Sequence, residues 1–194
     1  MGTPAEVLEQ PLAQARHKLT VTEFQRMGEA GILDEDDRVE LIDGAIYDMA
    51  PIGSRHAAIV NFLVERLTLS AKGRLLVRGQ GPLQIPPYNE PLPDVLLLKP
   101  RADRYRDSLP QPADVLLIVE IAHSSLGRDR DVKIPIYARE GIPEAWLVDV
   151  QRRVVTVYRG PAPEGYAEAF ELSEGSLAPG CLPPAAIALA ELFG

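Results

Sequence analysis

The chain has 194 residues, of which 28 are Asp or Glu and 20 are Lys or Arg, so its formal net charge is −8 at pH 7 and its pI is near 4.9. This acidic balance argues against a protein that coats nucleic acid nonspecifically, because such proteins are usually basic, but it allows a cleft in which metal ions offset the charge. The sequence contains no apolar run of about 20 residues, as a membrane span requires, and we expect no signal peptide. Cys181 is the only cysteine, so no disulfide can form within the chain. We therefore expect a cytoplasmic protein.

The amino-terminal part of the chain predicts a loose arm, a short helix and a β-hairpin. Residues 1–18 are expected to form the arm, and TVTE at 20–23 has the capping-box spacing of a helix that ends near Gly28 or Gly31. In RVELIDGAIYDM, residues 38–49, an Asp-Gly pair stands between two apolar segments, which is typical of a hairpin.

The middle of the chain predicts a long helix followed by strands. Ser54 can cap a helix that runs to about Lys72, and Gly73 ends it. The apolar face of this helix is predicted to consist of Ile59, Phe62, Leu63, Leu67 and Leu69. Strands are predicted at RLLVRG (74–79), GPLQI (81–85), PDVLLLK (93–99) and ADVLLIVEIA (113–122), the last being the most buried.

The remainder of the chain alternates between helical and extended patterns. A helix is predicted over 128–140, with strands at 144–150, 153–158 and 167–172. PPAAIALAELF, residues 183–193, predicts a closing helix that is opened by proline. The whole pattern indicates one α/β domain with a mixed central sheet.

Three carboxylates interrupt the predicted strands: Glu40 in the hairpin, Asp94 at the start of 93–99, and Glu120 inside the most buried strand. Neighbouring strands are about 5 Å apart, so these residues can converge, and converging carboxylates repel unless a proton or a hard cation joins them. Such oxygen ligands suit Mg²⁺ or Mn²⁺. Taken singly, Glu40 could be exposed on an edge hairpin, Asp94 a turn residue, and Glu120 the buried partner of an arginine. For Glu40 alone the exposed position is the better interpretation, whereas an ionised Glu120 needs a partner.

The helix after the most buried strand carries Asp129, Lys133 and Tyr137 at a spacing of four. Residues at this spacing share one helix face, so Lys133 can point back toward Glu120. The other interpretation is an ordinary Asp–Lys pair on a solvated face. Such a pair contributes only about 0.3–0.5 kcal/mol, so Lys133→Ala is expected to leave thermal stability nearly unchanged. Tyr137 is expected to pack rather than to react.

Four ordered blocks of the sequence resemble one protein family. They are VELIDGAIYDMAPIGSRH (39–56), PDV (93–95), VEIAHSSLGRDRDVK (119–133) and YAREGIPEAWLVD (137–149). In these blocks the chain resembles the Uma-two family, a group of putative restriction endonucleases in the PD-(D/E)XK nuclease superfamily, over roughly residues 19–160. The resemblance implies a restriction-endonuclease-like α/β core, with a mixed central β-sheet flanked by helices, as a single domain over residues 19–194.

The resemblance also implies roles for particular residues. Asp94 matches the Asp of the PD element and Glu120 the acidic residue of (D/E)XK, and both would hold Mg²⁺ or Mn²⁺. Glu40 matches an upstream acidic position that completes the metal site. The superfamily pattern has lysine where this chain has Ala122. In the Uma-two family the lysine comes from the following helix, where Lys133 stands, and it would orient the attacking water or stabilise the transition state.

The implied function is a metal-dependent endonuclease that hydrolyses phosphodiester bonds in nucleic acid, with DNA as the expected substrate and a homodimer as the expected assembly. His56 matches a histidine of the family and could contact phosphate, although a histidine at a helix end is often only a cap. Two alternatives stay open. One is a catalytically silent relative that binds nucleic acid or protein, which Ala122 and the acidic charge favour; the other is a structural or assembly protein with an incidental carboxylate cluster.

Overall fold

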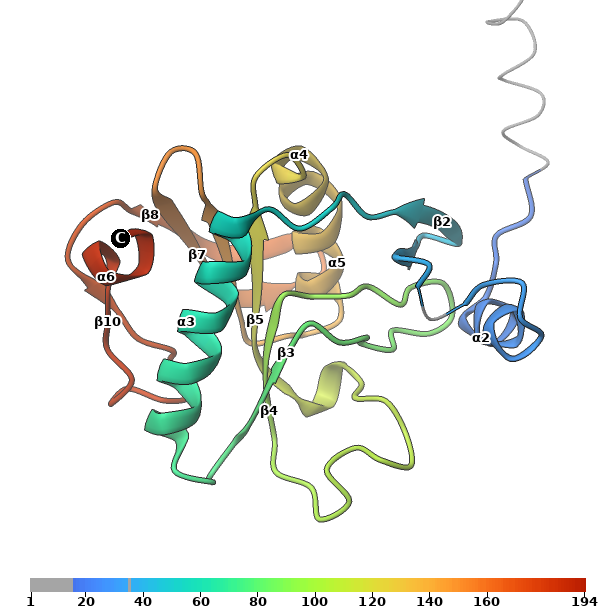
Figure 1. Cartoon of the computed structure of the whole chain (residues 1–194), viewed down its shortest axis with the longest axis horizontal. Coiled ribbons are helices and arrows are strands. Elements are labelled where there is room, and N and C mark those ends of the chain that lie inside the picture. The colour runs from blue at the N-terminus through green and yellow to red at the C-terminus, as the bar shows by residue number, and fades with distance from the viewer. Residues whose placement is uncertain (1–15, 35) are drawn as a thin grey trace, which may run out of the picture.

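A six-stranded sheet forms the centre of the computed structural model, which describes residues 16–34 and 36–194 (Figure 1). The strands follow the spatial order β3-β4-β5-β6-β7-β8; β5 and β6 are parallel, and every other neighbouring pair is antiparallel. Their bounds are β3 Leu76–Gly79, β4 Val95–Leu98, β5 Val115–Ala122, β6 Glu144–Asp149, β7 Val154–Ala162 and β8 Gly165–Leu172. The predicted mixed central sheet is therefore confirmed. Most of the predicted arm, residues 1–15, lies outside the described residues.

Helices cover both faces of this sheet (Figure 1). The long helix α3, Ser54–Ala71, belongs to the apolar core that contains Val119 of β5. The helix α5, Ile134–Arg139, belongs to a second core that contains Ile118, the preceding residue of β5. Because side chains alternate along a strand, Glu120 shares the face of Ile118 and points toward α5.

The connection from β5 to β6 is helical, because parallel strands need a crossover of this kind. It consists of α4, Leu126–Arg128, a five-residue π-helical turn η2, Asp129–Lys133, and α5. The amide of Ile134 donates to the carbonyl of Asp129, five residues earlier. The predicted helix over 128–140 is confirmed, and its π-helical turn is of a kind that occurs often at functional sites.

The helix α3 matches the predicted span, with two differences in detail. Gly53 is the N-cap and Ser54 is the first helical residue, so the prediction that Ser54 caps the helix is wrong. Leu69 is 66% exposed and does not belong to the apolar face. It follows Leu67 by two residues, which is about 200° around a helix, so it points away from the core.

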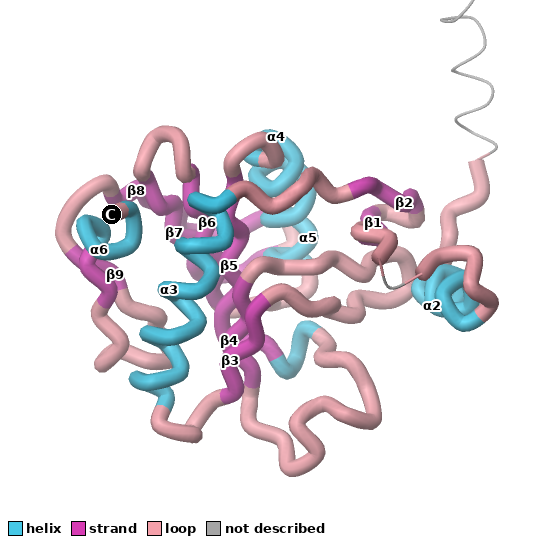
Figure 2. The backbone as a smooth tube through the Cα atoms, viewed as in Figure 1, coloured by secondary structure: helices cyan, strands magenta, loops and turns pink. Residues whose placement is uncertain are grey.

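The predicted hairpin forms a separate two-stranded sheet of β1, Val39–Ile42, and β2, Ala45–Asp48. Asp43 and Gly44 both have positive φ, as the tight turn between the strands requires. A Cβ atom on Gly44 would lie 2.6 Å from the Cβ atom of Lys18, so glycine is needed at this position. The hairpin lies beside the central sheet (Figure 2).

The helix α2, Val21–Glu29, begins with the predicted capping box. The hydroxyl of Thr20 accepts a hydrogen bond from the amide of Glu23, and the Glu23 carboxylate accepts one from the amide of Thr20. The bond from the Thr20 amide is the main reason why the pKa of Glu23 is lowered to about 2. Val21 then joins the helix to the body of the protein through a 2.8 Å hydrogen bond to the carbonyl of Pro87.

The predicted strand over 81–85 is wrong. This segment forms only an isolated bridge, between Ile85 and Asn89. Pro82 and Pro86 have no N–H groups, so the segment cannot donate the regular series of hydrogen bonds that a strand ladder needs.

The predicted closing helix over 183–193 is mostly wrong. Only Leu189–Phe193 is helical, as α6. The residues before it form β10, Ile187–Ala188, which pairs with β9, Ser176–Leu177. Sequence periodicity does not reveal this distant pairing. None of the described helices is long and apolar enough to cross a membrane.

Candidate active site

A pocket of about 410 Å³ opens beside the carboxyl end of β5. The five site residues predicted from the sequence all line this pocket: Glu40, His56, Asp94, Glu120 and Lys133. They come from five different parts of the chain, which are, in the same order, β1, α3, the residue before β4, β5 and the π-helical turn. The segment 49–53 lines it as well. This segment is the loop that links β2 to α3 (Figure 2). The fold therefore brings all the predicted site residues to one place.

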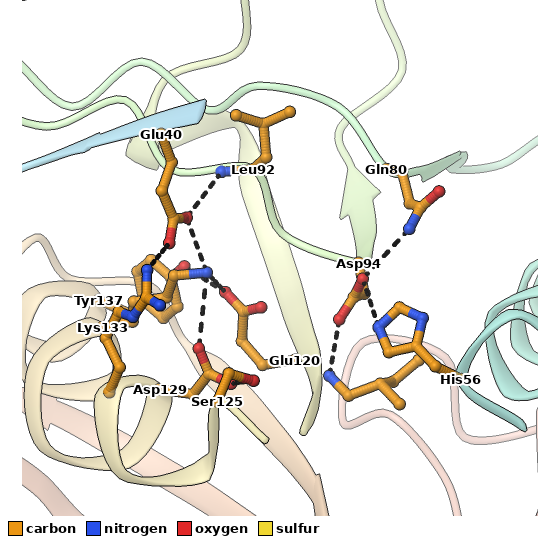
Figure 3. Close-up of polar contacts among 12 residues, drawn as sticks. Glu40, His56, Gln80, Leu92, Asp94, Glu120, Ser125, Asp129, Lys133 and Tyr137 are labelled. Atoms are coloured by element: carbon orange, nitrogen blue, oxygen red, sulfur yellow. Dashed lines mark hydrogen bonds and ion pairs between the residues drawn. The ribbon is translucent and has the colours of Figure 1, made fainter. Parts of the chain in front are cut away.

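Glu120 lies at the bottom of this pocket with only 2% of its surface exposed. Its Oε1 atom accepts a 2.5 Å hydrogen bond from the hydroxyl of Tyr137 and lies 3.3 Å from Nζ of Lys133 (Figure 3). Burial raises the pKa of Glu120 well above its ordinary value, although the ammonium of Lys133 opposes the rise. Tyr137 packs as predicted, and it also fixes the orientation of the Glu120 carboxylate.

Lys133 lies among three carboxylates. Its Nζ atom is 2.9 Å from Glu40, 3.3 Å from Glu120 and 3.6 Å from Asp129 (Figure 3). Burial disfavours the ammonium charge, but attraction to Glu120 and Glu40 outweighs burial and holds the pKa of Lys133 above its ordinary value. The lysine thus reaches Glu120 from the helical crossover, as the resemblance implied.

The Asp129–Lys133 pair is not on a solvated face. Both residues are 3% exposed, because the hairpin covers this side of the crossover and Glu40 contacts Lys133 from it. The interpretation as an exposed pair, on which the expectation for Lys133→Ala depends, is therefore wrong, and we expect a loss of stability instead. Removing one partner of a buried ion pair costs about 3–5 kcal/mol.

Glu40 is buried as well, at 2% exposure, so its interpretation as an exposed hairpin residue is wrong. Oε2 lies 2.9 Å from Nζ of Lys133, and Oε1 accepts a 3.4 Å hydrogen bond from the guanidinium of Arg128. The amide of Leu92 donates a longer bond, of 3.5 Å, to Oε2. Glu40 therefore joins the hairpin electrostatically to the crossover.

Asp94 immediately precedes β4 and is held by three groups (Figure 3). Oδ2 accepts a 2.8 Å hydrogen bond from the amide of Ile121, while Oδ1 lies 3.0 Å from Nε2 of His56 and 3.4 Å from the side-chain amide of Gln80. The register that pairs Val95 with Val119 brings Asp94 next to Glu120 on the neighbouring strand. His56 thus positions Asp94, and Nδ1 of His56 is buried without a hydrogen-bond partner among the described residues.

Sequence reasoning missed two residues of this pocket, Asp129 and Arg128. The sequence indicates only a helix pair for Asp129, yet Asp129 is buried and accepts a 2.6 Å hydrogen bond from the hydroxyl of Ser125. Burial raises its pKa, against the attraction of Lys133. The signal for both residues is their position, four and five residues before Lys133 in the same helical crossover.

The carboxylate oxygens of the pocket are ligands of the kind that a hard divalent cation prefers. The buried side chains that line the pocket include four carboxylates, Glu40, Asp94, Glu120 and Asp129, but only one cation, Lys133, because the arginines of the lining are half-buried or exposed. In the part of the chain that the structure describes, no three acidic, His or Cys side chains are already gathered as a metal cluster. Mg²⁺ commonly takes only one or two carboxylates, with waters and phosphate as its other ligands.

Comparison with known proteins gives one family and one fold. The family model for Uma2, described as putative restriction endonuclease, matches residues 21–190. No curated protein matches the sequence. The crystal structure of a putative nuclease belonging to DUF820 from Anabaena variabilis is similar, with a TM-score of 0.68 and 18% identity over 90% of this chain and 97% of that one. This similarity confirms the predicted α/β architecture.

Proposed function

The chain belongs to the Uma2 family of putative restriction endonucleases, and we propose that it is a metal-dependent endonuclease of the PD-(D/E)XK type that hydrolyses phosphodiester bonds in DNA in the cytoplasm. The contact between Lys133 and Glu120, 3.3 Å long, supports this proposal most strongly. It gives the pocket an amine despite Ala122, so the departure from the strand motif does not remove the group that the chemistry needs.

Asp94 and Glu120 would hold the metal ion, Mg²⁺ or Mn²⁺, with Glu40 as a third ligand. Such an ion would neutralise charge on the phosphate and lower the pKa of a bound water. The buried side chains of the pocket include four carboxylates but only one cation, Lys133, and this surplus of carboxylates favours the entry of a metal cation.

The protein's own groups would act on the water, on the phosphate and on the metal-binding carboxylates. Lys133 would orient the attacking water or stabilise the oxygen that gains charge in the transition state. Tyr137 and the amide of Ile121 keep the Glu120 and Asp94 carboxylates in place, through bonds of 2.5 and 2.8 Å. His56 would act on Asp94 in the same way, or contact phosphate once Asp94 is occupied.

The proposal is tested by incubating the purified protein with DNA and RNA panels in Mg²⁺, in Mn²⁺ and in a chelator. Cleavage of DNA that requires a divalent metal is expected. Lack of cleavage of every substrate with every metal would contradict the proposal. Binding of nucleic acid without cleavage would then favour the silent relative, and calorimetry without any metal binding would favour a structural role.

We also propose that the protein is a homodimer, because two active sites related by two-fold symmetry can act on the two strands of a duplex. Light scattering at micromolar concentration is expected to give twice the 21.2 kDa mass of one chain. A mass of one chain across the concentration range would overturn this assembly without affecting the proposed chemistry.

A further inference from the structure

The mouth of the pocket is basic, although its bottom and the protein as a whole are acidic. Arg38, Arg55 and Arg128 line the pocket, and the first two are exposed. We propose that Arg128 is a substrate-contacting residue whose guanidinium binds a backbone phosphate of the nucleic acid, next to the phosphate that is cleaved. This inference rests on the proposed function and adds a residue to it that neither the sequence motif nor the family description assigns.

The guanidinium of Arg128 has hydrogen-bond donors to spare. Among the described residues it donates one hydrogen bond, from NH1 to Glu40, and this bond is long, at 3.4 Å. Arg130, two residues later, instead donates from both Nε and NH2 to Asp131, at 2.8 and 3.0 Å. A guanidinium carries five N–H donors in a planar fork that matches phosphate oxygens. Arg128 therefore keeps the donors that a phosphate requires, whereas Arg130 has used one edge of its fork.

Arg128 is also held at the mouth of the pocket before any ligand arrives. Its guanidinium lies over the ring of Tyr47, 5.4 Å from the ring centroid. Tyr47 is the register partner of Glu40 across the hairpin, so both residues that hold Arg128 lie on the same face of β1 and β2. The ring and the carboxylate together restrict the guanidinium, which lowers the entropy lost when a phosphate binds.

Glu40 links Arg128 to the reaction centre. One of its oxygens contacts Arg128 and the other contacts Lys133, so the two cations are neighbours. The Lys133 side chain is 4% exposed and that of Arg128 is 34% exposed. Lys133 therefore faces the bottom of the pocket and Arg128 faces the entrance, as expected for groups that contact successive phosphates of one strand. The proposed occupant of this site is a polynucleotide backbone, because a nucleoside monophosphate offers no second, neighbouring phosphodiester.

The inference is tested by binding of a fluorescent DNA oligonucleotide to Glu120→Gln protein, in which the proposed cleavage is prevented. Adding Arg128→Gln is expected to weaken binding roughly tenfold for every sequence and to lower the slope of log K against log salt by about one. Arg130→Gln is the matched control, because it removes an arginine from the same crossover at an exposed position outside the pocket lining. It is expected to change neither quantity.

Equal affinity and equal salt slope for the Arg128→Gln protein and its parent would overturn the inference, as would lack of oligonucleotide binding by the parent. A purely structural Arg128 would instead lower the thermal stability without changing the salt slope, so unfolding curves are measured for each variant. Cleavage by the unaltered protein is scored separately. Metal-dependent cleavage together with an unchanged Arg128→Gln salt slope would reject this inference and leave the proposed function in place.

Discussion

Replacing Lys133 with methionine is expected to lower the free energy of unfolding by about 3–5 kcal/mol at neutral pH and to reduce cleavage by about 10²-fold or more. Methionine keeps an unbranched apolar stem but removes the ammonium that separates Glu40, Glu120 and Asp129, at distances of 2.9 to 3.6 Å. Three buried carboxylates would then face one another. Chemical denaturation and initial cleavage rates measure the two effects.

The loss of stability in this variant should depend on pH. Burial already raises the pKa of Glu120 in the folded protein, and loss of the Lys133 charge raises it further. A carboxyl whose pKa is higher in the folded state than in the unfolded state favours folding at low pH and disfavours it as the pH rises through the folded pKa. The difference in stability between the Lys133→Met protein and its parent should therefore shrink as the pH is lowered below the raised pKa.

The control for Lys133→Met is the double variant Glu120→Gln with Lys133→Met. It removes one of the stranded carboxylates along with the ammonium, so it should be more stable than the single Lys133→Met variant. If Lys133→Met unfolds at the same denaturant concentration as the parent, the buried ion cluster does not form. If it cleaves at the parental rate, the amine from the crossover has no part in the chemistry.

Glu120→Gln is expected to abolish cleavage and the binding of Mg²⁺ and Mn²⁺ while the fold stays intact. The amide oxygen of glutamine can still accept the hydrogen bond from Tyr137, and Glu40 and Asp129 still contact Lys133. Without metal the variant should be at least as stable as its parent, because burial disfavours the charge that is removed. Calorimetry of metal binding and thermal unfolding measure these outcomes.

The matched variant for Glu120→Gln is Glu144→Gln. Glu144 is also a buried carboxylate on the central sheet, but it begins β6 and contacts Trp146, Arg159 and Gly180 outside the pocket. Its replacement should leave metal binding and cleavage unchanged even if it lowers stability. Undiminished metal binding in Glu120→Gln would reject the assignment of Glu120 as a ligand.

The elements that could be predicted are those whose signals are local. The capping box of α2, the Asp-Gly turn and the apolar run of β5 lie within a few neighbouring residues, and all three were confirmed. The segments 81–85 and 183–193 were predicted wrongly because prolines and a distant strand pairing decide their structure. The prolines are visible in the sequence, whereas the pairing of residues 187–188 with residues 176–177 is not.

The residues of the site also divide into those with a local sequence signal and those whose position depends on distant contacts. Glu120 and Asp94 stand out in the sequence because charged residues interrupt apolar strands. The burial of Asp129 and the position of Arg128 depend instead on the hairpin, which lies more than 80 residues earlier in the chain and covers the crossover through Glu40. A helix face shows in its own sequence that it is polar, but not whether another segment covers it.

The separate sheet formed by the hairpin has a consequence for how the pocket is completed. β1 and β2 pair with each other, and the hairpin is tied to the neighbouring loop by backbone bonds such as that between Gly44 and the carbonyl of Tyr88. Such a unit can open locally at a free energy below that of global unfolding. Each opening would move Glu40 and Tyr47 away from Lys133 and Arg128 together. Amide hydrogen exchange in the hairpin would therefore report how often the pocket lacks these two residues while the central sheet stays folded.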